Sequence, residues 1–412
     1  MRVDVDRQRL VETMKEQAEI GGTEGGGLHR LALSDADREA RDWFVDRAED
    51  AGLDVRVDAF GNTFARRSGA DADAEPVLVG SHLDSQPYGG IYDGALGVVA
   101  ALEFVRTLND EGIETRRPVE VVNWTNEEGS RFPPAMQGSG VWAGAHDIET
   151  EYAKTDRDGN RLVDELERIG YRGDEPAEPR EPYDSYLELH VEQGPYLEAN
   201  DADVGIVTDI VGFSWGEVTF RGQADHSGTT PMHHRSDALV AAADVTTAVR
   251  RLPGTLGERT VATVGSLSLE PNSVNVVPET VTFTWDVRDA DDAVIDAAVE
   301  RVEREIAAAA EREGVDHEVE RLMRAPTVDF PERTVSAVAE AVDDLGYDGM
   351  RLVSGAGHDA THAASVCDAG MVFAVSEDGK SHTEDEYTSW PDCYRAANTL
   401  ANAAFDLAEP AE

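Results

Sequence analysis

Apolar positions in the first half of the chain form short runs separated by stretches with helical spacing. The β-rich runs are 77–81 (VLVGS), 119–125 (VEVVNWT) and 186–191 (YLELHV). A helix is predicted over 35–50, with Ser34 as a capping residue at its start and Gly52 after its end. Strands that alternate with helices predict an α/β sheet, and in such sheets ligand-binding groups gather where the strands end.

The pattern changes after Gly212. Two alternating segments, WGEVTFRGQADHSG and VTFTWDVRD, are each followed by a segment with helical spacing, and the second helix ends at Gly314. This β-α-β-α order predicts a compact two-layer α+β domain inserted into a larger α/β domain. We therefore expect the larger domain to comprise residues 1–211 and 326–412, and the inserted domain to comprise residues 212–325.

The charge of the 412-residue chain is strongly negative. It has 36 basic and 83 acidic residues, a net charge of −47, and its only lysines are Lys15, Lys154 and Lys380. The acidic residues are spread over a sequence that keeps its apolar periodicity, which indicates a solvated surface on a folded protein. Such a surface suits a cytoplasm of very high salt, where screening weakens self-repulsion, so we expect a halophilic source.

Several classes of partner are not expected. No basic stripe is present to face the phosphates of a nucleic acid. The N-terminus lacks the apolar segment of a signal peptide, and no 18 apolar residues run together, so we expect no membrane association and a cytoplasmic location. Cys367 and Cys393 are too few for a disulfide framework, and we expect them to have packing roles.

The segment SHLDSQPYGGIYDG, which follows the first apolar run, carries candidate chemistry. His82 and Asp84 are two residues apart at a strand end, so in an extended chain both side chains point to the same side. A glycine-rich turn can bring Asp93 back toward the imidazole. This arrangement suits a metal site in which Asp84 orients His82. A capping role in an Asp-Gly turn would explain Asp93 equally well.

Further candidate ligands lie near the ends of other predicted strands: Glu127, Glu128, His190 and His382. Each has a simpler explanation, because adjacent glutamates can be surface charge, His190 can be a core histidine and His382 can belong to an ordinary loop. Together, one Asp, one Glu and three His form a nitrogen and oxygen donor set suited to two metal ions with a bridging carboxylate. Glu127 would then remain free as a general base.

These residues resemble a known family, the metal-dependent amidohydrolases that include N-carbamoyl-L-amino acid hydrolases, allantoate amidohydrolases and β-ureidopropionases. The resemblance runs in order through roughly residues 75–390. It rests on the motifs GSHLDSQPYGGIYDGALGV, NEEGSRF, ELHVEQGPYLE, HSGTTPMHHRSDAL, PNSVNVVPETVTFTWDVRD, SGAGHDA and SEDGKSHTEDE.

The resemblance implies a metallo-exopeptidase-like α/β catalytic domain with an inserted lid and dimerisation domain. It implies two divalent metal ions per subunit, with zinc preferred and manganese, cobalt or nickel also suited to the ligands. One ion would be held by His82, Asp93 and His190, and the other by Asp93, Glu128 and His382. Glu127 would be the base and Asp84 the support of His82.

The resemblance also implies roles for residues that bind substrate. In a homodimer, His226 from the neighbouring subunit would stabilise the oxyanion, although it could instead be a turn histidine that caps the helix starting near Arg235. Arg288 could bind a carboxylate through two parallel hydrogen bonds, or form a surface ion pair. The remaining substrate-binding positions are Gln193, Asn275, Gly355 and Gly357; glycine turns also have purely structural uses.

The expected function is hydrolysis of a linear C–N bond other than a peptide bond. The favoured substrates are small anionic ureido compounds, N-carbamoyl-L-amino acids or allantoate, with release of ammonia and carbon dioxide. Closure of the lid, with a hinge near Gly212 and Ala325, would bring His226 and Arg288 onto the substrate. A metallo-exopeptidase or N-acyl-amino-acid deacylase is the alternative, although Gly94 replaces the second aspartate that those enzymes usually carry. A non-catalytic metal- or ligand-binding relative is the alternative from another class.

Overall fold

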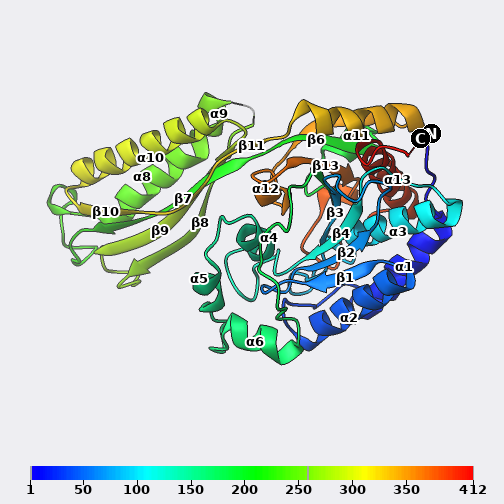
Figure 1. Ribbon diagram of the computed structural model, residues 1–412. Coiled ribbons are helices and arrows are strands. Elements are labelled where there is room, and N and C mark those ends of the chain that lie inside the picture. The colour runs from blue at the N-terminus through cyan, green and yellow to red at the C-terminus, as the bar shows by residue number, and fades with distance from the viewer. Residues whose placement is uncertain (1, 258, 412) are drawn as a thin grey trace. The chain divides into compact units, whose positions relative to one another are not determined.

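A mixed nine-stranded sheet is built from strands within residues 54–210 and 328–374 of the computed structural model, which describes residues 2–257 and 259–411 (Figure 1). Along the sheet the strands follow the order β1 (Asp54–Val57), β2 (Thr63–Arg67), β4 (Val119–Trp124), β3 (Val77–His82), β5 (Ser185–Val191), β13 (Asp368–Ala374), β6 (Val204–Ile210) and β11 (Val328–Asp329), and β12 (Gly349–Ser354) pairs with β6. The four central strands β4, β3, β5 and β13 are parallel, whereas β2 and β6 join them in antiparallel fashion. Four neighbouring carboxyl ends therefore meet at one edge of the sheet.

Helices cover this sheet. The strands β3, β5 and β13 pack against α3 (Ala95–Glu111), α13 (Trp390–Leu407) and α11 (Glu332–Leu345). Helix α3 is buried over most of its length, which agrees with the apolar run ALGVVAAL at its start. The other helices are α1 (Arg7–Glu19), α2 (Asp35–Asp50), α4 (Gln137–Trp142), α5 (Ile148–Tyr152), α6 (Leu162–Ile169), α7 (Tyr196–Ala199) and α12 (Ala360–Ala363). The Ser34 hydroxyl accepts a hydrogen bond from the Asp37 amide at 3.2 Å, so the predicted cap of α2 is confirmed.

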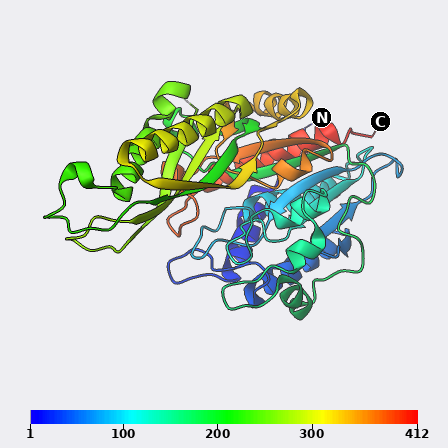
Figure 2. The same cartoon turned by 90° about the vertical axis from the view of Figure 1, so that its left-hand side faces the viewer.

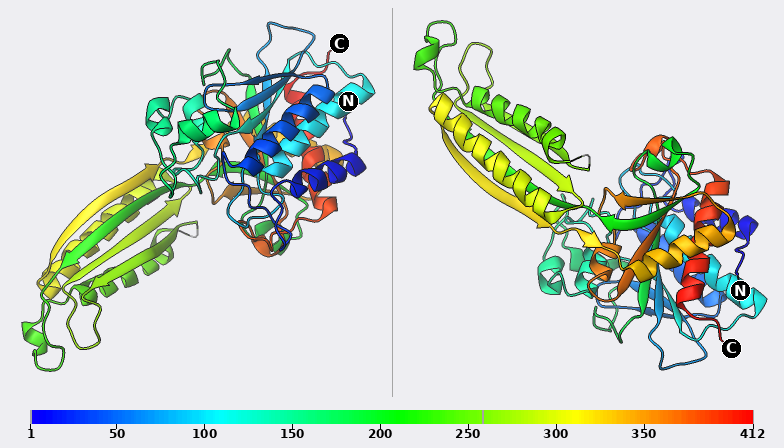
Figure 3. Two further views of the ribbon diagram at one scale, coloured as in Figure 1. Left: turned by 90° about the horizontal axis from the view of Figure 1, so that it is seen from below. Right: turned by 90° about the horizontal axis from the view of Figure 1, so that it is seen from above.

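The chain forms two compact units, one comprising residues up to Thr208 and from Asp329 onward, the other Asp209–Val328. The second unit has an antiparallel sheet in the order β10 (Asp316–Ala325), β7 (Gly212–Arg221), β9 (Thr280–Asp289) and β8 (Val261–Glu270). Helices α8 (Ala238–Arg251) and α10 (Asp292–Glu313) lie side by side on one face of it (Figure 3), and α9 (Pro253–Leu256) follows α8. The predicted α/β fold with a two-layer α+β insertion is confirmed.

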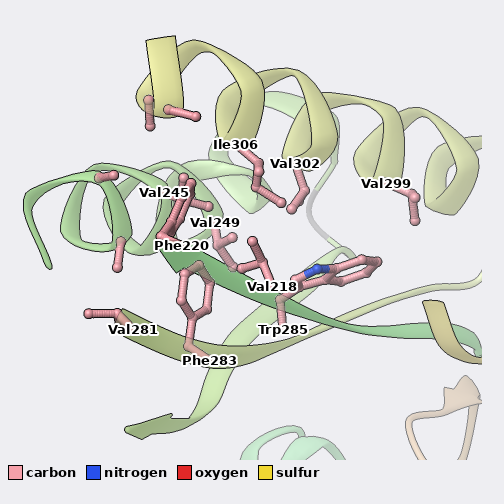
Figure 4. Packing of buried hydrophobic residues seen from close by; sticks show 14 of the residues in the cluster. Val218, Phe220, Val245, Val249, Val281, Phe283, Trp285, Val299, Val302 and Ile306 are labelled. Atoms are coloured by element: carbon pink, nitrogen blue, oxygen red, sulfur yellow. The ribbon is translucent and has the colours of Figure 1, made fainter. Parts of the chain in front are cut away.

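The core of the second unit lies between these two helices and the two central strands (Figure 4). Strands β7 and β9 alternate buried and partly exposed positions, as their sequences predict. Phe220, Phe283 and Trp285 from the strands are at most 1% exposed and pack against Val249 and Ile306 from the helices.

The order of elements in the second unit differs from the prediction. The structure has β-α-β-β-α-β, leaving aside the single turn α9, because β8 and β10 form the two edges of the sheet. Both edge strands are largely exposed on both faces, so their sequences lack the apolar alternation that marks a half-buried strand.

The start of the chain is held by its last helix. The side chain of Asn402 in α13 accepts a hydrogen bond from the Val3 amide at 3.1 Å and donates one to the Val3 carbonyl at 2.9 Å. The two ends of the chain therefore lie near each other in the first unit (Figure 2). Among the residues that the structure describes, no helix is long and apolar enough to span a membrane.

Candidate metal centre and active site

The sheet brings together side chains that are far apart in sequence. His82 is the last residue of β3, Glu127 and Glu128 follow β4 closely, and His190 lies next to the end of β5. His382 lies in the loop after β13. Because these four strands are parallel neighbours, their carboxyl ends deliver all of these side chains to one edge.

Asp93 lies at the centre of this group. Its Oδ1 atom is 3.0 Å from Nε2 of His190 and 3.4 Å from Nε2 of His82. Its Oδ2 atom is 3.5 Å from Nε2 of His382, which in turn lies 3.5 Å from Oε2 of Glu128. The side chains thus form two candidate metal-ligand groups, each with donor atoms within 4.8 Å of one another, and both groups include Asp93.

The orientation of the histidines fits metal binding. Nδ1 of His82 lies 2.9 Å from the carbonyl oxygen of Asp84, and Nδ1 of His190 lies 3.0 Å from that of Val191. When Nδ1 donates to a carbonyl, the lone pair of Nε2 is left facing Asp93. Nε2 of His82 is buried and has no hydrogen-bond partner within the described part of the chain. Imidazole nitrogens and carboxylate oxygens are common ligands of divalent zinc and similar metals, so the donor set fits a metal centre.

Asp84 supports the centre in two ways. Its main-chain carbonyl orients His82, whereas its carboxylate oxygen Oδ1 lies 3.8 Å from the imidazole Nδ1. The two carboxylate oxygens instead accept hydrogen bonds from the amides of Glu127 and Glu128, each at 3.2 Å. Asp84 therefore connects the end of β3 with the loop that carries both glutamates.

Among the protein groups alone, burial and neighbouring charges shift several pKa values. Burial raises the pKa of Glu127 well above its ordinary value, and it raises that of Glu128 to about 8. Burial would also raise the pKa of Asp93, but the charges of His190 and His82 and the close contact with Nε2 of His190 outweigh it and hold that pKa well below its usual range. So many buried carboxyl groups in one place call for positive charge nearby, which divalent cations supply.

Two glutamines contact the candidate ligands. The main-chain amide of Gln86 donates to Oε1 of Glu128 at 2.9 Å, and its side-chain Nε2 donates to Oε2 of Glu128 at 2.8 Å. Nε2 of Gln193, a predicted substrate-binding residue, lies 3.2 Å from Oδ2 of Asp93 and 3.2 Å from Nε2 of His382. The structure thus places Gln193 at the centre itself.

Gly94 allows a close approach between the chain and His82. Its φ is 63°, and a Cβ atom at this position would lie only 2.3 to 2.5 Å from ring atoms of His82. A residue with a side chain cannot occupy this position unless the imidazole or the loop moves.

Three of the predicted substrate-binding residues belong to the second unit. His226 and Asn275 lie close together there. The main-chain amide of Ser227 donates to the carbonyl of Asn275 at 3.0 Å, and the main chain of His226 pairs with that of Val276 in an isolated antiparallel β-bridge. The side chain that caps α8 is Asp237, which accepts hydrogen bonds from two amides of the first turn, so the capping alternative for His226 was wrong. Arg288 is paired with Asp286 at 3.0 Å, and its guanidinium lies 5.4 Å from the centre of the Phe213 ring.

The glycines of the SGAGHDA motif lie between β12 and α12. A Cβ atom on Gly355 would meet nothing within 4 Å, whereas one on Gly357 would approach Sδ of Met136 to 3.2 Å. His358, which the sequence did not single out, is buried with its ring centre 4.5 Å from that of His190, and its Nε2 atom lies 2.9 Å from the Ser354 hydroxyl. The loop therefore runs beside the candidate metal centre.

Ser381 and Glu386 were also not singled out as site residues. Both belong to the motif around His382, and both are hydrogen-bonded within the group around Asp93. In so acidic a chain, a further glutamate in an acidic loop does not stand out in the sequence as a site residue.

A parallel α/β sheet that presents histidines and carboxylates at its carboxyl edge, with one aspartate shared between two groups, defines the class of metal-dependent hydrolases. Residues 78–406 match the sequence profile of peptidase family M20/M25/M40, and the chain belongs to this family. It is a hydrolase of carbon–nitrogen bonds.

Individual relatives within this family, and one solved structure, are similar to this chain over almost its whole length. An N-carbamoyl-L-amino-acid amidohydrolase from Rhizobium meliloti is 44% identical over 99% of this chain and 98% of its own length. An allantoate amidohydrolase from Escherichia coli is 33% identical over 98% of each chain. The crystal structure of an amidase of the hydantoinase/carbamoylase family from Burkholderia multivorans has a TM-score of 0.94 and 46% identity, covering 99% of this chain and 100% of that one.

Proposed function

We propose that the protein hydrolyses the ureido group of N-carbamoyl-L-amino acids, with allantoate as the second candidate substrate. The observation that carries the proposal is the position of Asp93, whose two carboxylate oxygens face two different groups of ligands. The near full-length similarity to an N-carbamoyl-L-amino-acid amidohydrolase supports the choice of substrate.

In this proposal one divalent ion is held by His82, Asp93 and His190, and the second by Asp93, Glu128 and His382. When bound, the two ions would polarise the scissile carbonyl and lower the pKa of the attacking water. Zinc is the favoured metal, and manganese, cobalt and nickel suit the same ligands.

Glu127 is proposed as the general base. Its Oε2 atom lies 3.5 Å from Nε2 of His82, so its carboxylate borders the group of ligands without belonging to either set. Glu127 takes a proton from the attacking water, whose oxygen bonds to the ureido carbon, and returns it to the departing nitrogen. Ammonia leaves, and the remaining carbamate loses carbon dioxide to give the free amino acid.

The remaining residues are proposed to bind substrate. Gln193, Gly355 and Gly357 belong to the first unit, and Asn275 and Arg288 to the second. Arg288 would exchange its partner Asp286 for the substrate carboxylate, which gives specificity for anionic substrates. Asp84 holds the main chain of Glu127 in place for the reaction.

We further propose that the second unit serves as a lid and forms a homodimer in which His226 of one subunit stabilises the oxyanion in the other. Strand β8 supports this proposal, because it forms an edge of its sheet and exposes Val261 and Leu267. An edge strand presents main-chain groups that a strand of a second chain can pair with. Sedimentation velocity of the purified protein checks the dimer, and a monomer at micromolar concentration would contradict it.

The net charge of −47 supports a halophilic source and a cytoplasmic location in this proposal. Two divalent ions and Arg288 would give an anionic substrate a local positive field within a strongly negative protein.

The experiment that tests the function is ammonia release by zinc- or manganese-loaded protein in molar salt. The panel contains N-carbamoyl-L-amino acids, allantoate, a dipeptide and an N-acetyl-amino acid. We expect release from the carbamoyl compounds. Hydrolysis of only the dipeptide or the acetyl compound would assign the protein to the exopeptidase or deacylase alternative.

A further inference from the structure

Glu386 is a buried carboxylate that the proposed reaction leaves without a role. It is 5% exposed, and its Oε1 atom accepts hydrogen bonds from the main-chain amides of Tyr92 at 3.2 Å and Asp93 at 3.0 Å. A Cβ atom on Gly90 would lie only 2.1 Å from the same oxygen. Glycine at position 90 thus lets the carboxylate reach the main chain immediately before and at Asp93.

The second oxygen of Glu386 reaches the side chain of Asp93 through Ser381. The Ser381 hydroxyl lies 3.1 Å from Oε2 of Glu386 and 2.7 Å from Oδ2 of Asp93. This hydroxyl has one hydrogen and two carboxylate acceptors, so it can donate to Glu386 when the Asp93 oxygen is engaged elsewhere.

These contacts connect two distant parts of the sequence. Asp93 lies in the loop between β3 and α3, whereas Ser381, His382 and Glu386 lie in the loop between β13 and α13. Each of the two candidate metal-ligand groups needs Asp93, and one of them also needs His382. The relative position of these two loops therefore decides whether Asp93 can present one oxygen to each group.

We propose that Glu386 is a positioning residue of the metal centre, which fixes the main chain of Asp93 against the loop that carries His382. The inference rests on the proposed function, because it assumes that Asp93 binds both metal ions. A purely structural carboxylate this close to Asp93 would add repulsion to a site that is already rich in buried negative charge. Bound divalent ions offset that repulsion, so a loaded centre tolerates the charge of Glu386.

The test measures metal binding by the full-length protein after removal of metal, using zinc titration calorimetry in molar salt. Outer-shell substitutions at metal sites commonly cost about 10- to 100-fold in affinity, and we expect a loss of this size for Glu386→Ala. Glu386→Gln should keep an affinity close to that of the unmodified protein, because the amide oxygen still accepts both main-chain hydrogen bonds. Asp385→Ala is the matched control, since Asp385 is an exposed acid in the same loop, and it should change nothing.

Unchanged zinc affinity in folded Glu386→Ala, even with a lower melting temperature, would overturn the proposal and leave Glu386 a structural residue. If Glu386→Ala does not fold, Glu386→Asp takes its place, because its shorter side chain keeps the charge but cannot span the two amides and Ser381. Unmodified affinity in folded Glu386→Asp would likewise overturn the proposal. Failure of the unmodified protein to bind zinc or manganese would instead overturn the metal centre, and silence on ureido substrates with normal zinc binding would overturn only the proposed reaction.

Discussion

Glu127 combines a buried position with the proposed role of general base. Its main chain is held by Asp84, and its side chain borders His82 without joining either candidate ligand group. A glutamine at this position would keep the shape and packing of the side chain, but its amide cannot take up a proton as a general base does.

Glu127→Gln should therefore lower kcat by about 100- to 10,000-fold, the usual range for loss of a general base, while both metal ions stay bound. Ammonia release and metal content measured on the same sample check this. Glu39→Gln, the same change at an exposed position of α2, serves as the control. Near-normal turnover in Glu127→Gln would remove Glu127 from the proposed role.

Gly94 offers a second test at the scale of one residue. Gly94→Ala and Gly112→Ala introduce the same side chain at the two ends of α3, and both glycines have a φ of 63°. A Cβ atom at Gly94 meets the ring of His82, whereas one at Gly112 meets nothing within 4 Å. We expect both variants to have a lower melting temperature, but only Gly94→Ala to lose metal affinity. Equal metal affinities would show that the contact with His82 does not matter.

The residues around the candidate metal centre could be predicted because they lie at or after the ends of apolar strands, and parallel strands end together. Which atom of each residue makes a given contact could not be predicted in the same way. The carbonyl and the carboxylate of Asp84 are alternative partners for His82, and only the folded main chain decides between them. Arg288 could be placed on a strand, but its pairing with Asp286 depends on where two neighbouring side chains of one strand point.

At the scale of elements, burial decided what could be predicted. Strands β3, β4 and β5 are buried along their whole length and appear in the sequence as short runs rich in apolar and β-branched residues. Strands β8 and β10 are held by main-chain pairing at the edges of their sheet. Their side-chain pattern therefore gives little indication that these segments are strands. Edge strands of this kind can be found only once their partners are known.

The segment after α13 is fixed by a group of charges. The Glu409 carboxylate accepts hydrogen bonds from Arg116 at 2.6 and 2.8 Å, and the main chain pairs Thr115 with Pro410. The hydrogen bond with Arg116 lowers the pKa of Glu409 to about 2, below the value of about 4.5 expected in the unfolded chain. Its contribution to stability is therefore complete above pH 4.5 and is lost as the pH falls toward 2.

Glu409→Gln should lower the free energy of unfolding slightly at pH 6, since the pair is partly exposed and screened by salt, and should have no effect near pH 2. Urea unfolding of both proteins at fixed salt between pH 6 and pH 2 measures the difference. A difference that stays constant over this range would show that the charge of Glu409 does not stabilise the segment.

For the whole molecule, we expect the net charge of −47 to make the stability of the fold depend on salt. Self-repulsion among surface carboxylates opposes the folded state in dilute buffer, and salt reduces it because the screening length falls from about 10 Å at 0.1 M to about 3 Å at 1 M. We expect the melting temperature to rise steeply between 0.1 and 2 M potassium chloride at pH 7. Calorimetry checks this, and an equal melting temperature in both solutions would contradict a halophilic adaptation.

The insertion of the second unit also determines the order in which the chain can fold during synthesis. The second unit is continuous in sequence, so it can fold as soon as residue 328 is available. The main sheet must wait longer, because β13 joins it by pairing Asp368 with Ser185. His382 follows still later, so the nascent chain can assemble the complete candidate metal centre only when almost all of the protein has been made.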